Sequence, residues 1–544
     1  MINLLIFGGL DGIGKNMMAF ESEEAIIVLD VGIMFPDIDM YGIDKVIPDF
    51  SYLIEKKDKV KCIFITHGHE DHIGAIGYFL EHINVPVYGT KLSLGLIEHK
   101  LKERGMVSYD LRVINDSSVV DVNDFQVSFL RVSHSIPDGV MTVIDTPVGR
   151  IVHSGDFKVD YTPIDGKVMD LNRIAQIGQD GVMLFLSDST NALKKGHTLS
   201  ESMVGESFER VFKGITGRLL VTTFSSNIHR IQQAITVAKN HGRKICFAGL
   251  SMENTAKIAK KLGYLNFEDE DVFFIGDVDK YPDNQVLILT TGSQGEPLAA
   301  LSRIANDTYR LFQIKTGDTV IMSALPIPGN EKTVYSTIDK LGRKGIKVIY
   351  EEESKMHVSG HAYQEELKLL LMLLKPQFFI PVHGEYRHLS AHAKLAEELG
   401  VVEDILIAEN GNVINISSDG MKIINKLVLH STYIDSNDMR LEDESLIEER
   451  HTMANDGVVA ITFPIDHKGN IDGDLKVVSK GVTTNPEEFM TGLKDSIVDQ
   501  YNHFSTMNHL DIDTLSRTLE DMVKKYMSKR IGKRPAVIPI IIKR

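Results

Sequence analysis

The chain has 544 residues, of which 43% are hydrophobic and 25% are charged, a composition typical of a globular protein with about three domains. The net charge of −16 argues against binding nucleic acid through overall charge, so such binding would need a local basic groove or bound metal ions. The two cysteines, Cys62 and Cys246, exclude a disulfide framework and a cysteine zinc site.

Neither a secretory signal nor a membrane span is apparent. Residues 1–7 lack a basic region and form too short an apolar stretch. The most apolar later segment, residues 367–380, contains Lys368, Lys375 and Pro376, so it cannot cross a bilayer. We therefore expect a cytoplasmic protein with no membrane partner.

A strand predicted over residues 4–7 is followed by the glycine-rich stretch Gly8-Gly9-Leu10-Asp11-Gly12-Ile13-Gly14-Lys15-Asn16. This stretch nearly matches the G-x-x-x-x-G-K-[ST] loop that binds nucleotide phosphates, but Asn16 stands where that loop needs a hydroxyl for Mg²⁺. We therefore interpret it as a turn between two strands rather than as a nucleotide site. The next predicted strand, residues 25–30, ends at Asp30.

The most informative stretch is Thr66-His67-Gly68-His69-Glu70-Asp71-His72. It follows a run of β-forming residues at 60–65 and precedes a predicted helix. His67 and His69 are two residues apart, so they project to the same side of an extended backbone. Three imidazoles and a carboxylate form a ligand set that Zn²⁺ prefers. The alternative is an exposed polar loop, but four metal-competent side chains at one strand end rarely coincide by chance.

Further candidate ligands follow later predicted strands. These strands are expected at residues 119–122, 126–132, 141–146, 150–153 and 377–382. His134, Asp156 and His383 each lie at or just past a strand end, where a rigid scaffold can hold a ligand. Each of them alone is more typical of an ordinary surface or turn residue. Downstream of the histidine cluster in the same chain, they become candidates to complete a metal centre.

The pattern changes after about residue 201, where strands and helices alternate. Strands are predicted at residues 218–223, 244–248, 272–275, 286–290, 319–323 and 347–350, with helices at 228–240, 252–262 and 332–344. Such alternation is typical of a parallel, doubly wound sheet. We predict domains at residues 1–202, 203–356 and 357–434, with the second inserted between two parts of the first. Residues 435–451 are expected to be a linker, and residues 452–544, with a helix at 511–527 and a strand at 537–542, a small α/β domain.

Three further segments join the histidine cluster in suggesting a family. They are Ser187-Asp188-Ser189-Thr190-Asn191, His357-Val358-Ser359-Gly360-His361-Ala362 and Pro381-Val382-His383-Gly384-Glu385. These segments resemble motifs A, B and C of the β-CASP group of the metallo-β-lactamase superfamily, whose signature is H-x-H-x-D-H. Over nearly its whole length the chain resembles the ribonuclease J family of that group. The resemblance implies an α/β fold: a metallo-β-lactamase αββα sandwich with an inserted doubly wound β-CASP domain and a small C-terminal α/β domain.

The resemblance also implies roles for the candidate ligands. His67, His69 and His134 would hold one Zn²⁺, Asp71, His72 and His383 a second, and Asp156 would bridge both; Mn²⁺ is an alternative metal. Two such ions suit an in-line displacement at phosphorus and lower the pKa of a shared water towards about 7.

The expected catalytic residues are Asp71, His361 as general acid, and Asp188, which would orient His361. A helix N-cap or turn is the alternative for Asp188, and a strand-end turn for His361. By the same resemblance, a histidine at position 383 favours RNA over DNA as the substrate.

A pocket for the 5′-monophosphate of RNA is also implied. Its expected residues are His357, Val358, Ser359, Gly360, His361, Ser225, Ser226, Asn227, His229 and Arg230. Residues 222–230 run from a strand into a helix, whose N-terminus and hydroxyl groups are suited to an anion. Simple N-capping is the alternative for the two serines.

We therefore expect a zinc-dependent ribonuclease in RNA decay and maturation. It would be a 5′→3′ exonuclease on 5′-monophosphorylated, single-stranded RNA and also an endonuclease, acting as a homodimer or homotetramer with partners in RNA-decay complexes. The alternatives are another metallo-β-lactamase hydrolase, a DNA-directed nuclease and a non-catalytic scaffold. The inserted domain argues against another hydrolase, His383 argues against a DNA-directed nuclease, and the complete ligand set argues against a scaffold.

Two features of the last third of the chain stay open. Residues 433–441 are acidic and lack glycine, which puts in doubt an accessory calcium site known in some relatives. The basic residues between Lys524 and Arg534 surround Tyr526 and could contact RNA or form a solvated helix face.

Overall fold

The computed structural model describes all residues except 38–39, 293–298, 325–329, 351–354, 436–437, 442–443, 468–469, 483–485, 506–511 and 544. Parts of the predicted linker, of the 433–441 stretch and of the helix expected to begin at Asp511 lie outside the described residues. The chain divides into two compact units, Met1–Phe35 with Val46–Ser431 and Pro36–Lys45 with Thr432–Arg544. Within the described residues, no helix has the length and apolarity that a membrane span requires.

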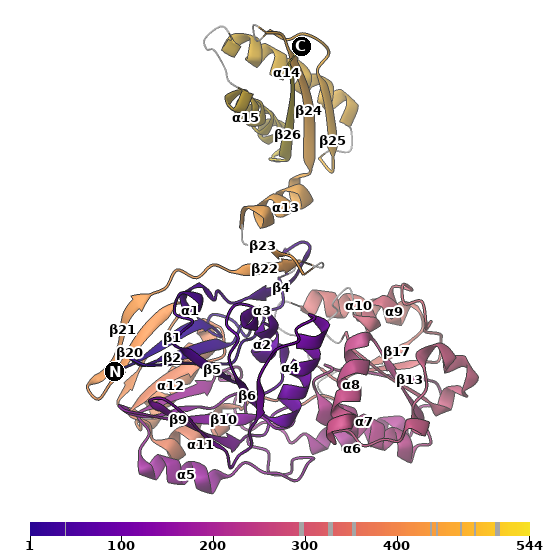
Figure 1. Ribbon diagram of the computed structural model, residues 1–544. Helices are drawn as coiled ribbons and strands as arrows, with labels where there is room; N and C mark the ends of the chain where they lie inside the picture. Colours follow the sequence, from indigo (N-terminus) through magenta and orange to yellow (C-terminus); the bar gives the residue numbers. More distant parts are fainter. Residues whose placement is uncertain are drawn as a thin grey trace. The chain divides into compact units, whose positions relative to one another are not determined.

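The larger unit contains a sandwich in which one β-sheet faces another (Figure 1). In spatial order, the first sheet consists of β21 (Gly420–Lys426), β20 (Asn412–Ser417), β1 (Ile2–Gly8), β2 (Met17–Glu21), β3 (Ile26–Leu29), β5 (Val60–Phe64), β6 (Val87–Gly89) and β7 (Leu111–Val113). The second consists of β19 (Asp404–Ile405), β18 (Phe378–Val382), β12 (Leu184–Asp188), β11 (Gly149–His153), β10 (Val140–Thr146), β9 (Phe125–Arg131) and β8 (Val119–Val122).

Apolar side chains fill the space between these sheets, and helices cover their outer faces. Phe64 of β5 and Phe129 of β9 meet across the core, with ring centroids 5.7 Å apart. The helices beside the first sheet are α1 (Ser51–Glu55), α2 (Glu70–Ile73), α3 (Ile76–Leu80) and α4 (Lys91–Glu103), and those on the second are α5 (Leu171–Asp180), α11 (Gln364–Leu374) and α12 (Tyr386–Leu399). Strands such as β3 and β12 are buried on both faces for this reason. The expected αββα order is confirmed.

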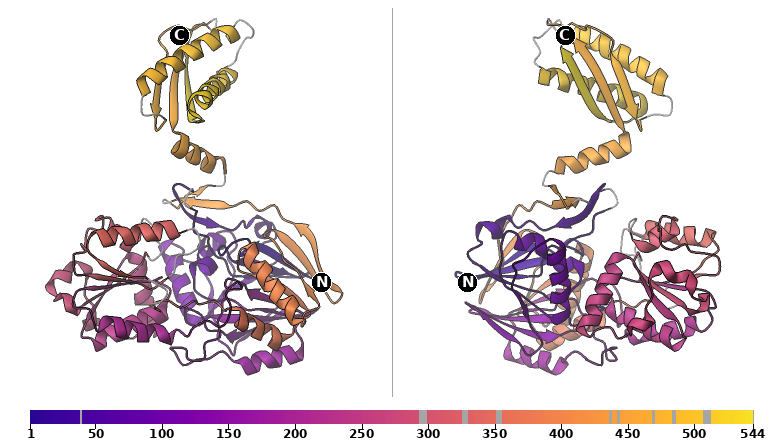
Figure 2. Two further views of the ribbon diagram at one scale, coloured as in Figure 1. Left: turned by 180° about the vertical axis from the view of Figure 1, so that it is seen from behind. Right: turned by 45° about the vertical axis from the view of Figure 1, so that its right-hand side comes forward.

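The inserted domain, coloured pink, forms its own lobe beside the sandwich in both views of Figure 2. Its sheet has the order β14 (Lys244–Ala248), β15 (Val286–Thr290), β13 (Leu219–Thr222), β16 (Thr319–Met322) and β17 (Lys347–Ile349), and these strands are parallel to their neighbours. Its helices are α6 (Ser202–Phe212), α7 (Ile228–Asn240), α8 (Leu250–Leu262), α9 (Ala300–Ala305) and α10 (Glu331–Arg343). The predicted doubly wound fold is therefore confirmed.

One strand predicted in this domain, over residues 272–275, is wrong. Only Val272 forms an isolated bridge, with Ile245, and the surrounding chain folds as the short 3₁₀ helices η1 (Asp269–Asp271), η2 (Ile275–Lys280) and η3 (Asp283–Gln285). Phe273 and Ile275 are buried in the domain core, so their hydrophobicity correctly indicated burial. The aspartates, the glycine and the proline around them favour turns and break the strand.

The smaller unit contains further small sheets and helices. A sheet of β23 (Arg440–Leu441), β22 (Thr432–Asp435) and β4 (Ile43–Ile47) precedes α13 (Glu444–Asp456), which occupies much of the stretch expected to be a linker. A second sheet has the order β25 (Lys476–Lys480), β24 (Val458–Ile465) and β26 (Ala536–Lys543), and α14 (Pro486–Ser505) and α15 (Ile512–Ile531) pack on it.

Replacing Phe129 by alanine tests the inter-sheet core. The side chain is fully buried against Phe64, so Phe129→Ala should lower the free energy of unfolding by about 3–5 kcal/mol through lost contacts and a cavity. Urea unfolding followed by circular dichroism measures this change. Val107→Ala, at a side chain that is 97% exposed, is the control and should change it by less than about 0.5 kcal/mol. A loss below 1 kcal/mol, on the order of one exposed contact, would contradict the packing described.

Candidate metal centre and active site

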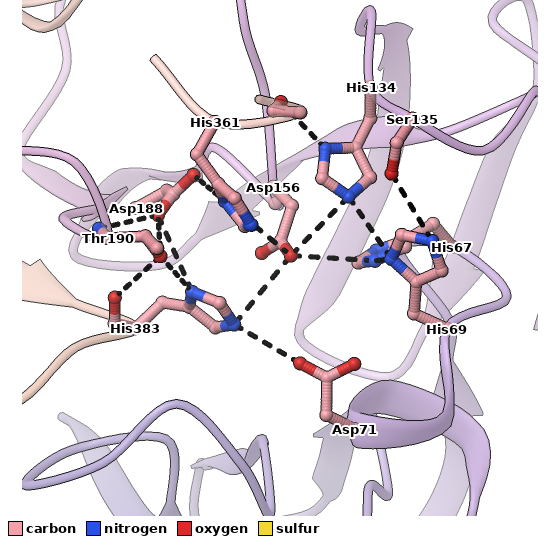
Figure 3. A network of polar contacts seen from close by, with 12 residues as sticks. His67, His69, Asp71, His134, Ser135, Asp156, Asp188, Thr190, His361 and His383 are labelled. Carbon is pink, nitrogen blue, oxygen red and sulfur yellow. Dashed lines mark hydrogen bonds and ion pairs between the residues drawn. The ribbon is translucent and has the colours of Figure 1, made fainter. Parts of the chain in front are cut away.

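The predicted ligands follow the ends of strands in both sheets, and the structure brings their side chains together in one cluster; Figure 3 labels all of them except His72. His67 and His69 follow β5, and Asp71 and His72 lie in the short helix α2. His134 follows β9, Asp156 follows β11 and His383 follows β18. Each ligand thus closely follows a strand whose position is set by the packed core.

These side chains form two overlapping groups of metal-competent donors. One is His67, His69, His134 and Asp156, and the other is Asp71, His72, His383 and Asp156; in each, the donor atoms lie within 4.8 Å of one another. In the first group, Nδ1 of His69 lies 3.1 Å from Nε2 of both His67 and His134. In the second, Nε2 of His72 and Nε2 of His383 each lie 3.4 Å from Oδ2 of Asp71.

The protonation of the donors suits a divalent cation. Burial lowers the pKa of His67 and His134 well below the usual value, so both imidazoles are neutral and have a free lone pair. Burial alone would raise the pKa of Asp156, but the positive charges of His383 and His72 outweigh it and keep the carboxylate ionised. Neutral imidazole and ionised carboxylate are the forms that bind Zn²⁺. The neighbouring aspartates raise the pKa of His72 and of His383, so these two rings would release their protons when a cation binds. The residues present therefore fit a metal centre.

Asp30, which directly follows β3, holds two of the imidazoles in place. Its carboxylate accepts hydrogen bonds from Nδ1 of His72 at 2.8 Å and from the Thr66 hydroxyl at 2.8 Å. Because the Thr66 hydroxyl donates to Asp30, it accepts from Nδ1 of His67 at 3.0 Å. Both rings then present Nε2 to the centre, an arrangement that also raises ligand basicity.

Asp188, at the end of β12 in the second sheet, likewise orients two histidines. One of its oxygens lies 2.8 Å from Nδ1 of His361, and the other accepts from the Thr190 hydroxyl at 2.8 Å. That hydroxyl lies 2.7 Å from Nδ1 of His383, so it relays the orientation of this ring to Asp188. Asp188 thus supports an expected ligand and the expected general acid together.

His361, the expected general acid, is held in its protonated form by Asp188. Burial lowers its pKa, but the charge and hydrogen bond of Asp188 more than compensate, so the pKa is raised and the ring holds its proton. Its side chain is 20% exposed, whereas those of the neighbouring His134 and His383 are 1% and 5% exposed. Its ring packs against those of His134 and His383, with centroids 5.0 Å and 5.4 Å away.

The loop between Met356 and Ala362 also contacts the metal centre through its backbone. The Gly360 carbonyl lies 2.8 Å from Nδ1 of His134, so it accepts from that nitrogen and leaves Nε2 of His134 facing the centre. A Cβ atom at Gly360 would lie 2.7 Å from Cε1 of His134, which explains why glycine stands here. The Ser359 hydroxyl accepts from the side-chain amide of Asn191 at 2.7 Å and from the backbone N–H of His361 at 3.1 Å.

The other expected phosphate-binding residues lie around the start of α7, after β13. The Ser225 hydroxyl pairs with that of Ser251 at 2.8 Å, and Ser226 and His229 are half-buried. Asn227 is buried and hydrogen-bonds weakly to Thr223 at 3.4 Å. Arg230 differs from the rest, because it is completely buried and its N–H groups bond to protein atoms. His357 and Val358 are among its partners.

Several residues of this site carried no clear signal in the sequence. Asp30, Thr66 and Thr190 are such residues, since each is an ordinary polar residue at a strand end until its partner is known. The glycine-rich stretch near the N-terminus did carry a signal, because it nearly matches a phosphate-binding loop, but its contacts are with the ligands. Its Asn16 amide bonds the Asp71 backbone carbonyl at 3.1 Å, and the Gly9 carbonyl accepts from the backbone N–H of His383 at 2.9 Å. This turn between β1 and β2 therefore braces the metal centre.

The fold and the site define a metallo-hydrolase with an inserted β-CASP domain, and comparison with protein families agrees. Residues 10–195 match the metallo-beta-lactamase superfamily, 216–341 the ribonuclease J beta-CASP domain, 345–408 the Zn-dependent metallo-hydrolase RNA specificity domain and 445–544 the ribonuclease J C-terminal domain. A solved protein of unknown function from Enterococcus faecalis V583 shares the fold, with a TM-score of 0.54 and 15% identity over 76% of this chain and 99% of its own.

Full-length relatives give the family. Ribonuclease J2 of Bacillus subtilis is 40% identical, over 99% of this chain and 98% of its own length. Ribonuclease J of Thermus thermophilus is 39% identical, over 99% of this chain and 95% of its own length. The chain belongs to the ribonuclease J family, and with its cluster of metal donors it is a metal-dependent ribonuclease.

Removing the charge of Asp30 should weaken metal binding without touching a ligand. In Asp30→Asn the acceptor for His72 is weakened, so zinc affinity should fall about 10- to 100-fold. Competition with a chromophoric chelator measures this affinity. Asp145→Asn, which alters a carboxylate 37% exposed and paired with Arg150, is the matched control and should leave it unchanged. Equal zinc affinity in Asp30→Asn and the native chain would contradict the supporting role.

Proposed function

We propose that this chain is a zinc-dependent ribonuclease that degrades RNA from its 5′ end in the 5′→3′ direction, prefers a 5′-monophosphate and also cleaves internally. It would act in the cytoplasm on the decay and maturation of RNA. The observation that carries the proposal is the arrangement of Asp188, His361 and Ser359 beside the donor cluster.

Two zinc ions are proposed because the donors form two groups that share Asp156. His67, His69 and His134 would hold one ion, and Asp71, His72 and His383 the other, with Mn²⁺ as an alternative metal. When bound, the ions would activate a water molecule for attack on phosphorus and withdraw charge from the phosphoryl oxygens. The nitrogen-rich donor set favours zinc over magnesium.

His361 is proposed to protonate the leaving 3′-oxygen. Attack of water on phosphorus breaks the bond to that oxygen, which then needs a proton. Nδ1 of His361 is held by Asp188, so the proton would be delivered from Nε2 of this partly exposed ring. The cut leaves a 5′-phosphate on the remaining RNA, so each step produces the substrate for the next.

The proposed 5′-phosphate pocket includes Ser359 and the start of α7. The Ser359 oxygen accepts from Asn191 and from the His361 backbone, so its own proton is directed towards a further acceptor such as a phosphate oxygen. Ser226 and His229 are partly exposed where α7 begins, and the N-terminus of this 13-residue helix attracts an anion.

A homo-oligomer formed through the C-terminal module is proposed as well. Alternate residues of β26, Ile538, Ile540 and Ile542, are 40–51% exposed, and Val478 of β25 is 59% exposed. Val537 and Ile541 of the same strand pack on the module's core instead. The outer face of this sheet is thus apolar and suited to a second copy.

The 5′-end preference is tested with one RNA sequence carrying a 5′-monophosphate, a 5′-triphosphate or a 5′-hydroxyl. The zinc-loaded protein should release mononucleotides fastest from the monophosphate form, and Ser359→Ala should reduce this preference about tenfold by removing one hydrogen bond to a charged group. Products are resolved by size, and Ser117→Ala on an exposed turn is the control. Internal fragments alone, from all three RNAs at equal rates, would overturn the exonuclease assignment.

The role of His361 is tested by its replacement with alanine. His361→Ala should lower kcat about 10²- to 10⁴-fold, because the leaving oxygen loses its proton donor, while the zinc content stays that of the native chain. Single-turnover cleavage and metal analysis measure the two quantities. Full activity in the zinc-loaded variant would remove His361 from the mechanism.

A further inference from the structure

Arg230 was expected to bind RNA, but its surroundings indicate another role. The side chain is completely buried in α7. Nε and Nη2 donate to the Glu201 carboxylate at 2.8–3.0 Å, and Nη1 donates to the Ser323 carbonyl at 2.7 Å. The remaining N–H groups reach Nδ1 of His357 at 2.9 Å and the Val358 carbonyl at 3.2 Å. All five N–H groups of the guanidinium are therefore engaged, and none is left for a phosphate.

Two partners of Arg230, His357 and Val358, belong to the loop that also contains Gly360 and His361. Two residues beyond Val358, the Gly360 carbonyl orients His134, and one residue later His361 pairs with Asp188. Arg230 also bonds the Ser323 carbonyl at the end of β16, and the Ser323 hydroxyl donates to the Met356 carbonyl at the start of the loop. The inserted domain thus holds this loop from two sides.

Glu201 extends the same network towards Asp156. Its carboxylate lies 3.8 Å from Nζ of Lys158, which is buried two residues after Asp156 and pairs with Asp160 at 3.5 Å. A backbone hydrogen bond links the same two segments, because the Ala362 N–H donates to the Phe157 carbonyl at 2.7 Å. A buried network of balanced charges tolerates little displacement, because any unpaired member would lose its partner without regaining water.

We propose that Arg230, held by Glu201, is a positioning residue that fixes the His357–His361 loop against the metal centre and does not contact RNA. The consequence for cleavage rests on the proposed function. Arginine is needed because its planar fork reaches four partners at once, whereas the three donors of a lysine cannot span them. The loop then presents the Gly360 carbonyl, the Ser359 hydroxyl and His361 in one fixed arrangement.

The test compares Arg230→Lys, Glu201→Gln and the double variant in the full-length, zinc-loaded chain. Arg230→Lys should lower kcat about 10- to 100-fold and weaken zinc binding by a similar factor, because His134 loses its fixed partner. KM and the salt dependence of RNA binding should stay native. Glu201→Gln should act in the same direction, and the double variant should lose no more than the larger single loss. This second variant also carries the comparison if Arg230→Lys fails to fold.

The matched control is Arg218→Lys. Arg218 is likewise buried in the inserted domain, but it bonds Asp318 at 2.7 and 2.8 Å and the Gln313 carbonyl at 2.9 Å rather than the His357–His361 loop. It should lower stability while kcat and zinc affinity stay native. The proposal would be overturned if Arg230→Lys raised KM and reduced the salt slope of RNA binding by about 0.7, with native kcat and zinc affinity. If the native chain cleaved no RNA, the proposed function would fail, while zinc affinity would still decide this inference.

Discussion

The buried carboxylate of Asp156 is the constraint on which the rest of this structure depends. One of its oxygens lies within 3.4–4.0 Å of ring nitrogens from His67, His72, His134, His361 and His383. Such a concentration of polar groups away from water is costly unless charge is balanced and each ring has a fixed partner. The donor set resolves this when divalent cations occupy it, which explains why the arrangement and metal dependence belong together.

The supporting groups show how the fold meets that constraint from both sheets. Asp30 and Asp188 each end a strand, each accepts from a threonine hydroxyl, and each reaches two histidines directly or through that hydroxyl. Their positions follow from strand register, which is set by the packing of the inter-sheet core. Ligand orientation is therefore a property of the sandwich itself, and the inserted domain adds to it through the loop that ends at His361.

Much of this could be predicted from the sequence, because the ligands lie in local motifs next to recognisable strands. His67, His69, Asp71 and His72 lie within six consecutive positions, and His383 follows an apolar strand. The alternating pattern of the inserted domain likewise indicated its parallel sheet, although hydrophobicity alone misled at residues 272–275. The role of Arg230 could not be predicted, because it depends on Glu201 and His357, which come into contact only in the folded chain. Whether the N–H groups of an arginine are already hydrogen-bonded within the protein depends on the tertiary structure.

The shared loop also bears on the size of the product. Ser359 and His361 are two residues apart, so the proposed phosphate pocket and the proposed acid are separated by at most about 7 Å of backbone. A 5′-phosphate bound at Ser359 would then leave little more than one nucleotide between itself and the bond being cut, so the proposed exonuclease would release mononucleotides rather than longer fragments. Internal cleavage needs no 5′-phosphate, so it would depend on the metal centre and His361 alone. Arg230 fixes this short distance, because it holds the loop at His357 and Val358, just before the pocket residue and the acid.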